Sequence, residues 1–214
     1  MKTYVYVDGF NLYYGKLRGS PYRWLDLNKL CALLLPGNTI TKIKYFTARV
    51  SARPDDPGQP VRQQIYLRAL STLPNVEIHY GHFLSYPIWM TLVVPYPAEQ
   101  LHANRNKVYV RVLKTEEKGS DVNIAAYLVR DAFRDEFEVA VIISNDSDLL
   151  APIQIVRGEL GKSVGVINPH RKASRVLVRE AEFVKTIRHG VLRASQFPPS
   201  LTDAHGTFSK PAEW

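Results

Sequence analysis

The predicted fold rests on Glu138-Val-Ala-Val-Ile-Ile-Ser-Asn-Asp-Ser-Asp-Leu-Leu150. Residues 139–143 form an unbroken apolar run, largely β-branched, which is typical of a strand buried on both faces of a parallel sheet. The run ends at Ser144, and the acids Asp146 and Asp148 follow at once. Open α/β sheets bind their ligands at the carboxyl ends of their strands. Two carboxylates at that edge repel each other and lose solvation unless a cation compensates them, so a metal site is the simplest interpretation.

The composition is that of a globular protein with a basic surface. Of the 214 residues, 45% are hydrophobic and 22% are charged, and no apolar run approaches the ~20 residues that a membrane span needs. The N-terminus has no signal-peptide pattern, so we expect a cytoplasmic protein without a membrane segment. The net charge of +8 favours a polyanionic partner such as nucleic acid, although a basic surface can also serve solubility alone. The single cysteine, Cys31, excludes an internal disulfide and a zinc site built from several thiolates.

Strand and helix patterns alternate along most of the chain, which indicates an α/β domain with a parallel sheet. The first strand, residues 3–8, ends at Asp8 directly before Gly9. Further strands are expected over residues 40–50, 76–84, 164–167 and 183–187, and helices over 61–73, 121–134 and 176–182. We expect one domain over residues 1–195, followed by a mobile tail over 196–214, because apolar periodicity is lost after Phe197.

The alternation breaks down over residues 86–114, where two strand patterns, 89–94 and 108–113, predict an inserted antiparallel β-ribbon. Its cations and aromatic residues include Trp89, Arg105, Lys107 and Tyr109. This mixture suits the binding of a flexible single-stranded nucleic acid. The aromatic residues are equally well explained as packing within the ribbon.

Four acids are expected at one edge of the sheet, if the first and central strands are neighbours. They are Asp8, Asp121, Asp146 and Asp148. Mg²⁺ and Mn²⁺ prefer such hard oxygen ligands and are often held by a few carboxylates together with phosphate oxygens. A metal of this kind polarises a phosphodiester and lowers the pKa of a bound water. Both a one-metal and a two-metal site are compatible with four acids.

Each acid also has a simpler explanation. Asp121 follows Ser120, the expected N-cap of a helix, and acids are favourable in a first helical turn for electrostatic reasons alone. Asp148 can support the next helix in the same way, and Asp8 before Gly9 can be a turn residue. Asp146 is the hardest to explain in this way. The coincidence of all four at the ends of elements favours a common site.

Four segments, taken together and in this order, resemble the NYN domain family of the PIN-like nuclease superfamily. They are Tyr4–Leu12, Glu117–Val122, Ile142–Leu149 and Leu160–Val164. The resemblance covers residues 3–189, and the chain is most similar to the LabA-type members. It implies a three-layer α/β/α fold around a mainly parallel sheet, a Mg²⁺- or Mn²⁺-dependent site, and hydrolysis of RNA phosphodiester bonds.

The resemblance also assigns residues to roles. The four acids match the metal-site positions of the family, Asn11 matches a polar residue that helps to hold the site together, and Ser144 matches the small hydroxyl residue before the acidic pair. Glu117 is a weaker candidate. Asn145 departs from the pattern, which commonly has glycine there, and we expect the turn to survive because asparagine tolerates a left-handed backbone.

The leading hypothesis is a metal-dependent ribonuclease that attacks single-stranded RNA with metal-activated water. Arg171, Lys172 and Arg175 would hold the RNA backbone. The alternative is a PIN-like module that binds RNA or a protein without cleavage, and the oligomeric state stays open, a homo-oligomer included. An aspartyl-phosphate enzyme would need a second aspartate two residues after Asp8, where the chain has Phe10. No Walker loop, dinucleotide-binding fingerprint or Ser/His/Asp pattern is present in the sequence.

Overall fold

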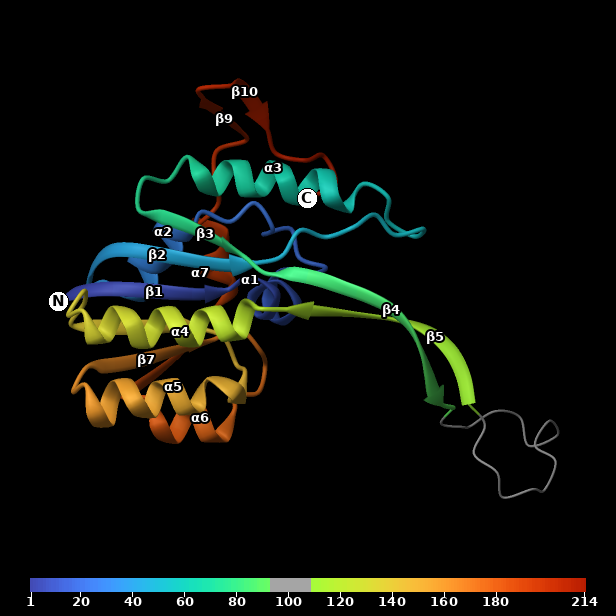
Figure 1. The fold of residues 1–214 in the computed structure, drawn as a ribbon. Helices are drawn as coiled ribbons and strands as arrows, with labels where there is room; N and C mark the ends of the chain where they lie inside the picture. The colour runs from blue at the N-terminus through green and yellow to red at the C-terminus, as the bar shows by residue number, and fades with distance from the viewer. Residues whose placement is uncertain (93–108) are drawn as a thin grey trace.

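A computed structural model describes residues 1–92 and 109–214 of the chain. At its centre lies a six-stranded parallel sheet in the order β3-β2-β1-β6-β7-β8 (Figure 1). The strands are β1 (Lys2–Asp8), β2 (Thr39–Thr47), β3 (Val76–Tyr80), β6 (Val139–Ile143), β7 (Ser163–Asn168) and β8 (Phe183–Thr186). The prediction of an α/β fold with a mainly parallel sheet is confirmed.

The apolar run of β6 is explained by its neighbours. Its five residues are all buried, and the strand pairs with β1 on one side and β7 on the other, so that Val141 lies opposite both Val5 and Gly165. Helices cover both faces of the sheet here, and no residue of the strand faces water. An unbroken β-branched sequence is what such a position requires.

Two helical layers complete a three-layer α/β/α fold, as predicted (Figure 1). One face of the sheet packs against α2 (Leu27–Leu34), α3 (Gln59–Ser71) and α7 (His189–Ala194), and the other against α4 (Ser120–Phe133), α5 (Leu150–Gln154) and α6 (Arg175–Glu180). The remaining helical segments are α1 (Gly9–Leu12), η1 (Tyr13–Leu17), η3 (Ser147–Leu149) and η4 (Ile155–Glu159). None of the helices in the described part of the chain has the length and apolar character that crossing a membrane requires.

The order of the strands places a topological switch point between β1 and β6. After β1 the chain adds β2 and β3 on one side, and it then returns to place β6, β7 and β8 on the other. In open α/β sheets the crevice beyond the carboxyl ends of the strands at such a point binds the ligand. Here those ends carry Asp8 and the residues after Ile143.

A polar cluster inside the domain fixes α4 to the sheet. Lys44 of β2 lies 2.5 Å from Asp131 of α4, measured from Nζ to Oδ2, and the Tyr6 hydroxyl donates to the same oxygen at 2.8 Å. Arg130 donates to the other oxygen of Asp131 at 2.7 and 3.0 Å. Burial alone would raise the pKa of Asp131, but hydrogen bonds from Lys44, Arg130 and Tyr6 hold it below its usual value. The cluster therefore sets the position of α4, whose first turn carries Asp121.

The β-ribbon consists of β4 (His82–Thr91) and β5 (Tyr109–Lys118), and it extends away from the sheet (Figure 1). Its antiparallel pairing begins at the pair of residue 82 with residue 118, earlier than the expected start at residue 86. The predicted continuous strand over 76–84 was wrong, because the chain breaks at Gly81. A Cβ at Gly81 would collide with the Glu117 side chain and the Lys118 carbonyl, so the close approach of the two strands requires glycine there. The outer part of the predicted ribbon, with Arg105 and Lys107, lies outside the described residues.

The C-terminal segment, expected to be a mobile tail, is folded in the structure. It forms the hairpin of β9 (Ser200–Asp203) and β10 (Gly206–Ser209), and Arg68 of α3 holds Asp203 at 2.7 Å through two hydrogen bonds. Trp214 packs against Tyr66, with ring centroids 5.7 Å apart. These contacts come from single residues without helical or strand spacing, and a search for periodicity does not detect them.

Candidate active site

Asp8 connects the two strands at the switch point. Its side chain is 5% exposed, Oδ1 accepts a hydrogen bond from the Asn11 backbone at 2.9 Å and so caps α1, and Oδ2 accepts from the Ser144 hydroxyl at 3.0 Å. Gly9 follows because a Cβ there would lie 2.7 Å from the Phe46 carbonyl oxygen. Asp8 is thus held by neutral donors from α1 and from the residue that follows β6.

The turn after β6 presents Asp146. Ser144 Oγ, which donates to Asp8, accepts from the Asp146 backbone at 3.1 Å, and Asp146 Oδ1 accepts from the Asp148 backbone at 3.0 Å to start η3. Asp146 lines the cavity described below, whereas Asp148 is exposed and does not line it. The helix-start explanation fits the backbone of Asp148, and its side chain is the most peripheral of the four acids.

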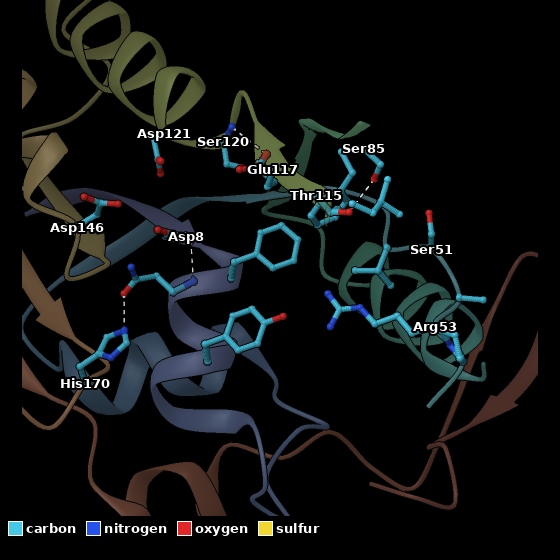
Figure 2. Close-up of a pocket in the computed structure, with 18 residues that line it drawn as sticks. Asp8, Ser51, Arg53, Ser85, Thr115, Glu117, Ser120, Asp121, Asp146 and His170 are labelled. Atoms are coloured by element: carbon cyan, nitrogen blue, oxygen red, sulfur yellow. Dashed lines mark hydrogen bonds between the residues drawn. The ribbon is translucent and has the colours of Figure 1, made fainter. Parts of the chain in front are cut away.

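Asp121 reaches the same space from α4. Figure 2 shows Asp8, Asp121 and Asp146 facing one cavity from three different elements. The prediction that Ser120 is the N-cap was wrong: Gly119 occupies that position with a φ of +102°, and Glu117 Oε1 accepts from the backbone and hydroxyl of Ser120 at 3.2 and 2.9 Å. Glu117 therefore supports the helix start and lines the cavity at the same time.

His170 completes the polar side of the site and was missed by the sequence analysis. Its Nε2 lies 3.0 Å from Asn11 Oδ1, which also accepts from the Asn145 backbone at 3.0 Å. An amide oxygen can only accept, so this contact needs a proton on Nε2 of His170. Asn168 accepts from the His170 backbone at 2.9 Å and fixes the turn after β7. The position of His170 after a strand end was the signal that could have identified it.

Asn145 connects the acidic turn to a basic loop. Its Nδ2 donates to the Lys172 carbonyl at 3.1 Å, and its Oδ1 accepts from the Ser174 backbone at 2.6 Å. The exposed Arg171, Lys172 and Arg175 are therefore anchored next to Asp146, although none of the three lines the cavity. The turn forms with asparagine at position 145 and needs no left-handed backbone there, because among the described non-glycine residues only Asp135 has a positive φ.

Two acids of the site, Asp8 and Asp121, have a raised pKa, and burial is the main cause for both. The pKa of Asp8 is raised to about 6, mainly by burial and also by the charges of Asp121 and Asp146, while the hydrogen bonds from Asn11 and Ser144 oppose the rise. Burial also raises the pKa of Asp121, followed by the charges of Asp146, Glu117 and Asp148. In the described part of the chain, no ion pair includes Asp8, Asp121, Asp146 or Asp148.

This donor set fits a hard divalent cation in its chemistry. Its ligand atoms would all be carboxylate oxygens, which Mg²⁺ and Mn²⁺ prefer. The negative charges of these acids repel one another, and no lysine or arginine of the described residues neutralises them. Over residues 1–92 and 109–214, no group of three His, Cys, Asp or Glu side chains is close enough to enclose a metal ion directly. Mg²⁺ commonly keeps several of its waters, and an ion held partly through water spans carboxylates that lie farther apart.

The cavity has a volume of about 770 Å³ and continues from the acids to an aromatic wall. The wall is formed by Phe10, Tyr14 and Phe83, with ring centroids 6.5 Å apart for Phe10 and Tyr14 and 5.6 Å apart for Phe10 and Phe83. Arg53, from the loop after β2, lies on the side of the cavity opposite Asp146 (Figure 2). These residues come from distant parts of the chain, and nothing in their sequence spacing indicated that they meet.

The chain is similar to a known domain family and to individual known proteins. The model of the NYN domain family matches residues 2–188. The chain is 32% identical over 238 residues to 6-hydroxy-3-succinoylpyridine 3-monooxygenase HspA of Pseudomonas putida, an alignment that covers 100% of this chain and 75% of that protein. The crystal structure of VPA0982, a protein of unknown function from Vibrio parahaemolyticus, is similar with a TM-score of 0.55 and 19% identity, covering 88% of this chain and 93% of that one. This last similarity concerns the fold alone.

Proposed function

The chain belongs to the NYN domain family, and from this premise we propose that it is a metal-dependent ribonuclease. The observation that carries the proposal is the convergence of Asp8, Asp121 and Asp146 on one cavity at the switch point of the sheet, where none of them forms an ion pair with a described residue. Buried acids whose charges oppose one another are typical of functional sites rather than of structural ion pairs. The PIN-like nuclease fold of the family and the net charge of +8 agree with a polyanionic substrate.

Each residue has a role in this proposal. Asp8, Asp121 and Asp146 would hold Mg²⁺ or Mn²⁺, which, when bound, supplies an activated water and polarises the scissile phosphodiester. Asn11 and Ser144 keep these carboxylates in place through the hydrogen bonds described above. The loop of Arg171, Lys172 and Arg175 would contact the RNA backbone beside the site. Asp148 would assist from the rim through water.

The proposal is tested by cleavage of labelled single-stranded RNA. We expect cutting with Mn²⁺ or Mg²⁺ and none with a chelator. Asp146→Asn should lower turnover by about 100-fold or more, because an acid that supports the transition state is lost. Glu159→Gln is the matched control, since Glu159 is exposed on η4 and away from the cavity. Cleavage that persists in Asp146→Asn, or binding without cleavage over several RNAs and metals, would contradict the proposal and favour a recognition module.

A second candidate, an aromatic-ring monooxygenase, is favoured by the 32% identity with the Pseudomonas protein over the whole chain. The aromatic wall and Arg53 could receive a planar ring that carries an acid group. Monooxygenation consumes O₂ and two electrons from a reductant, so the test offers 6-hydroxy-3-succinoylpyridine with NADH, with and without added flavin, and follows oxygen. We expect no substrate-dependent oxygen uptake. Oxygen uptake by the wild type that is lost in Arg53→Ala, together with no cleavage of RNA, would favour the monooxygenase over the ribonuclease.

A further inference from the structure

One face of the ribbon continues the wall of the cavity. Successive residues of a strand point to opposite faces, and antiparallel pairing places partners on the same face. The pairing of β4 with β5 therefore defines a cavity-side face, which consists of Phe83, Ser85, Pro87, Trp89 and Thr91 with their partners Glu117, Thr115, Leu113, Arg111 and Tyr109. Five of these residues, Phe83, Ser85, Leu113, Thr115 and Glu117, line the cavity, and no residue of the opposite face does. Figure 2 shows Ser85 and Thr115 joined across the strands at this wall.

Beyond the cavity the same face carries exposed aromatic and cationic side chains. Trp89 is 65% exposed and Tyr109 is 56% exposed, and Arg111 lies directly across from Trp89. Leu113, which lines the cavity where it meets these residues, is 71% exposed. Large apolar side chains gathered on one exposed surface commonly mark a binding site.

The opposite face of the ribbon also has exposed apolar side chains, Leu84 and Met90, but none of its described residues is an exposed Trp, Tyr or Phe. Its central pair, Ile88 and Val112, is half-buried, and its two lysines, Lys114 and Lys118, are neutralised by Glu116 at 2.5 and 3.2 Å. Arg111 forms no ion pair with any of the residues that the structure describes. Among the described residues of the ribbon, a guanidinium without an ion pair next to exposed rings is therefore found on the cavity-side face alone.

We infer that the cavity-side face is a track for single-stranded RNA, which leads the strand from Trp89, Arg111 and Tyr109 past Leu113 to the acids. Bases stack on the rings and Arg111 contacts a phosphate, which is how proteins bind single strands without reading their sequence. From Phe83 to Thr91 the track is about 27 Å long at ~3.4 Å per residue. The inference deepens the proposed function, on which it rests for the chemical class of the ligand. Its continuity with the cavity and the position of Arg111 directly across from the exposed ring of Trp89 favour RNA over a second copy of the chain.

Binding is measured first, in the full chain carrying Asp146→Asn so that the RNA stays intact. The probe is a fluorescein-labelled oligouridylate of about 20 nucleotides, longer than the site of a single binding fold. We expect Trp89→Ala to weaken binding about tenfold, because one base loses its stacking partner. Met90→Ala is the matched control: Met90 is adjacent and exposed but lies on the opposite face. Arg111→Ala should lower the slope of log affinity against log salt by about 0.7, and Lys118→Ala should leave it unchanged.

Cleavage with the wild-type acids gives a second readout. For the long RNA, Trp89→Ala should raise KM about tenfold with kcat unchanged, because only remote binding is lost. An oligouridylate of about four nucleotides, which occupies the cavity alone, should be cut equally well by both enzymes. A structural role of Trp89 would change both substrates together.

The outcomes separate this inference from the proposed function. Equal RNA affinity of the Trp89→Ala and Met90→Ala proteins overturns the track, even where Asp146-dependent cleavage stands. Weaker binding by Trp89→Ala without cleavage under any metal supports the track and overturns the nuclease. If sedimentation shows that Trp89→Ala converts a dimer to a monomer while RNA affinity is unchanged, the face is a contact between copies and the inference fails.

Discussion

Two buried aspartates of similar exposure lie in opposite electrostatic environments. Asp131, 2% exposed, is surrounded by Lys44, Arg130 and Tyr6, and its pKa is held below the usual value. Asp8, 5% exposed, has only the neutral donors of Asn11 and Ser144 among the described residues, and its pKa is raised to about 6. The first region neutralises its charge with the chain's own cations, whereas the second concentrates negative charge at a cavity. The difference identifies a structural acid and a functional one within the same fold.

The largest expected effect follows from breaking the neutralised cluster. Asp131→Asn removes the buried counter-ion of Lys44 and leaves only the half-exposed Glu77 at 4.0 Å, so we expect a loss of about 3–5 kcal/mol in the free energy of unfolding. Urea denaturation of the purified protein measures this. The double variant Lys44→Met with Asp131→Asn should lose less than the single variant, because no uncompensated charge remains. Equal losses would show that the ion pair is not what stabilises this region.

The cluster also predicts a pH dependence of stability. Because the folded pKa of Asp131 is lower than the value of about 3.8 for an ordinary aspartate, the contribution of its charge is present above pH ~4 and is lost as the pH falls through the lower folded value. The difference in unfolding free energy between the wild-type and Asp131→Asn proteins should therefore shrink from pH 7 to pH 3. Urea titrations at the two pH values measure it, and a constant difference would contradict the assignment of the effect to charge.

The opposite sign is expected at the site. Asp8→Asn removes a buried charge that neighbouring acids repel, so the metal-free protein should become more stable by about 2 kcal/mol while RNA cleavage is lost. Thermal denaturation in chelator and the cleavage assay measure the two effects. A destabilisation as large as that of Asp131→Asn would mean that Asp8 serves the fold, and the comparison between the two regions would no longer hold.

Those site residues could be predicted from the sequence that lie directly after a recognisable strand of the parallel sheet. The apolar run of β6 and the acids after β1 and β6 were sufficient to place Asp8 and Asp146 at one edge, because parallel strands end together. The ion pair of Lys44 with Asp131 joins residues that lie far apart in the sequence, and no local sequence pattern predicts it. The same holds for Phe10 and Phe83 in the cavity wall. The folded C-terminal hairpin was missed for the reason that its contacts are not periodic.

The smallest expected effect tests how neutral hydrogen bonds hold the site together. Asn145→Gly restores the residue that is common in the family, and it removes the bonds to Lys172 and Ser174. Since the backbone at Asn145 is not left-handed, glycine brings no conformational relief. We expect a loss of about 1 kcal/mol in stability and weaker RNA binding, because the loop of Arg171 and Lys172 is released from the acidic turn. Asn145→Asp is a useful comparison, because the aspartate keeps the acceptor for the Ser174 backbone and adds a negative charge beside Asp146. Asn28→Gly would not serve as a control, since Asn28 lies inside helix α2. Equal RNA affinity of Asn145→Gly and the wild type would show that the basic loop reaches its position without the hydrogen bonds of Asn145. Of the two regions compared, only the cluster around Asp131 would then depend on its side-chain contacts.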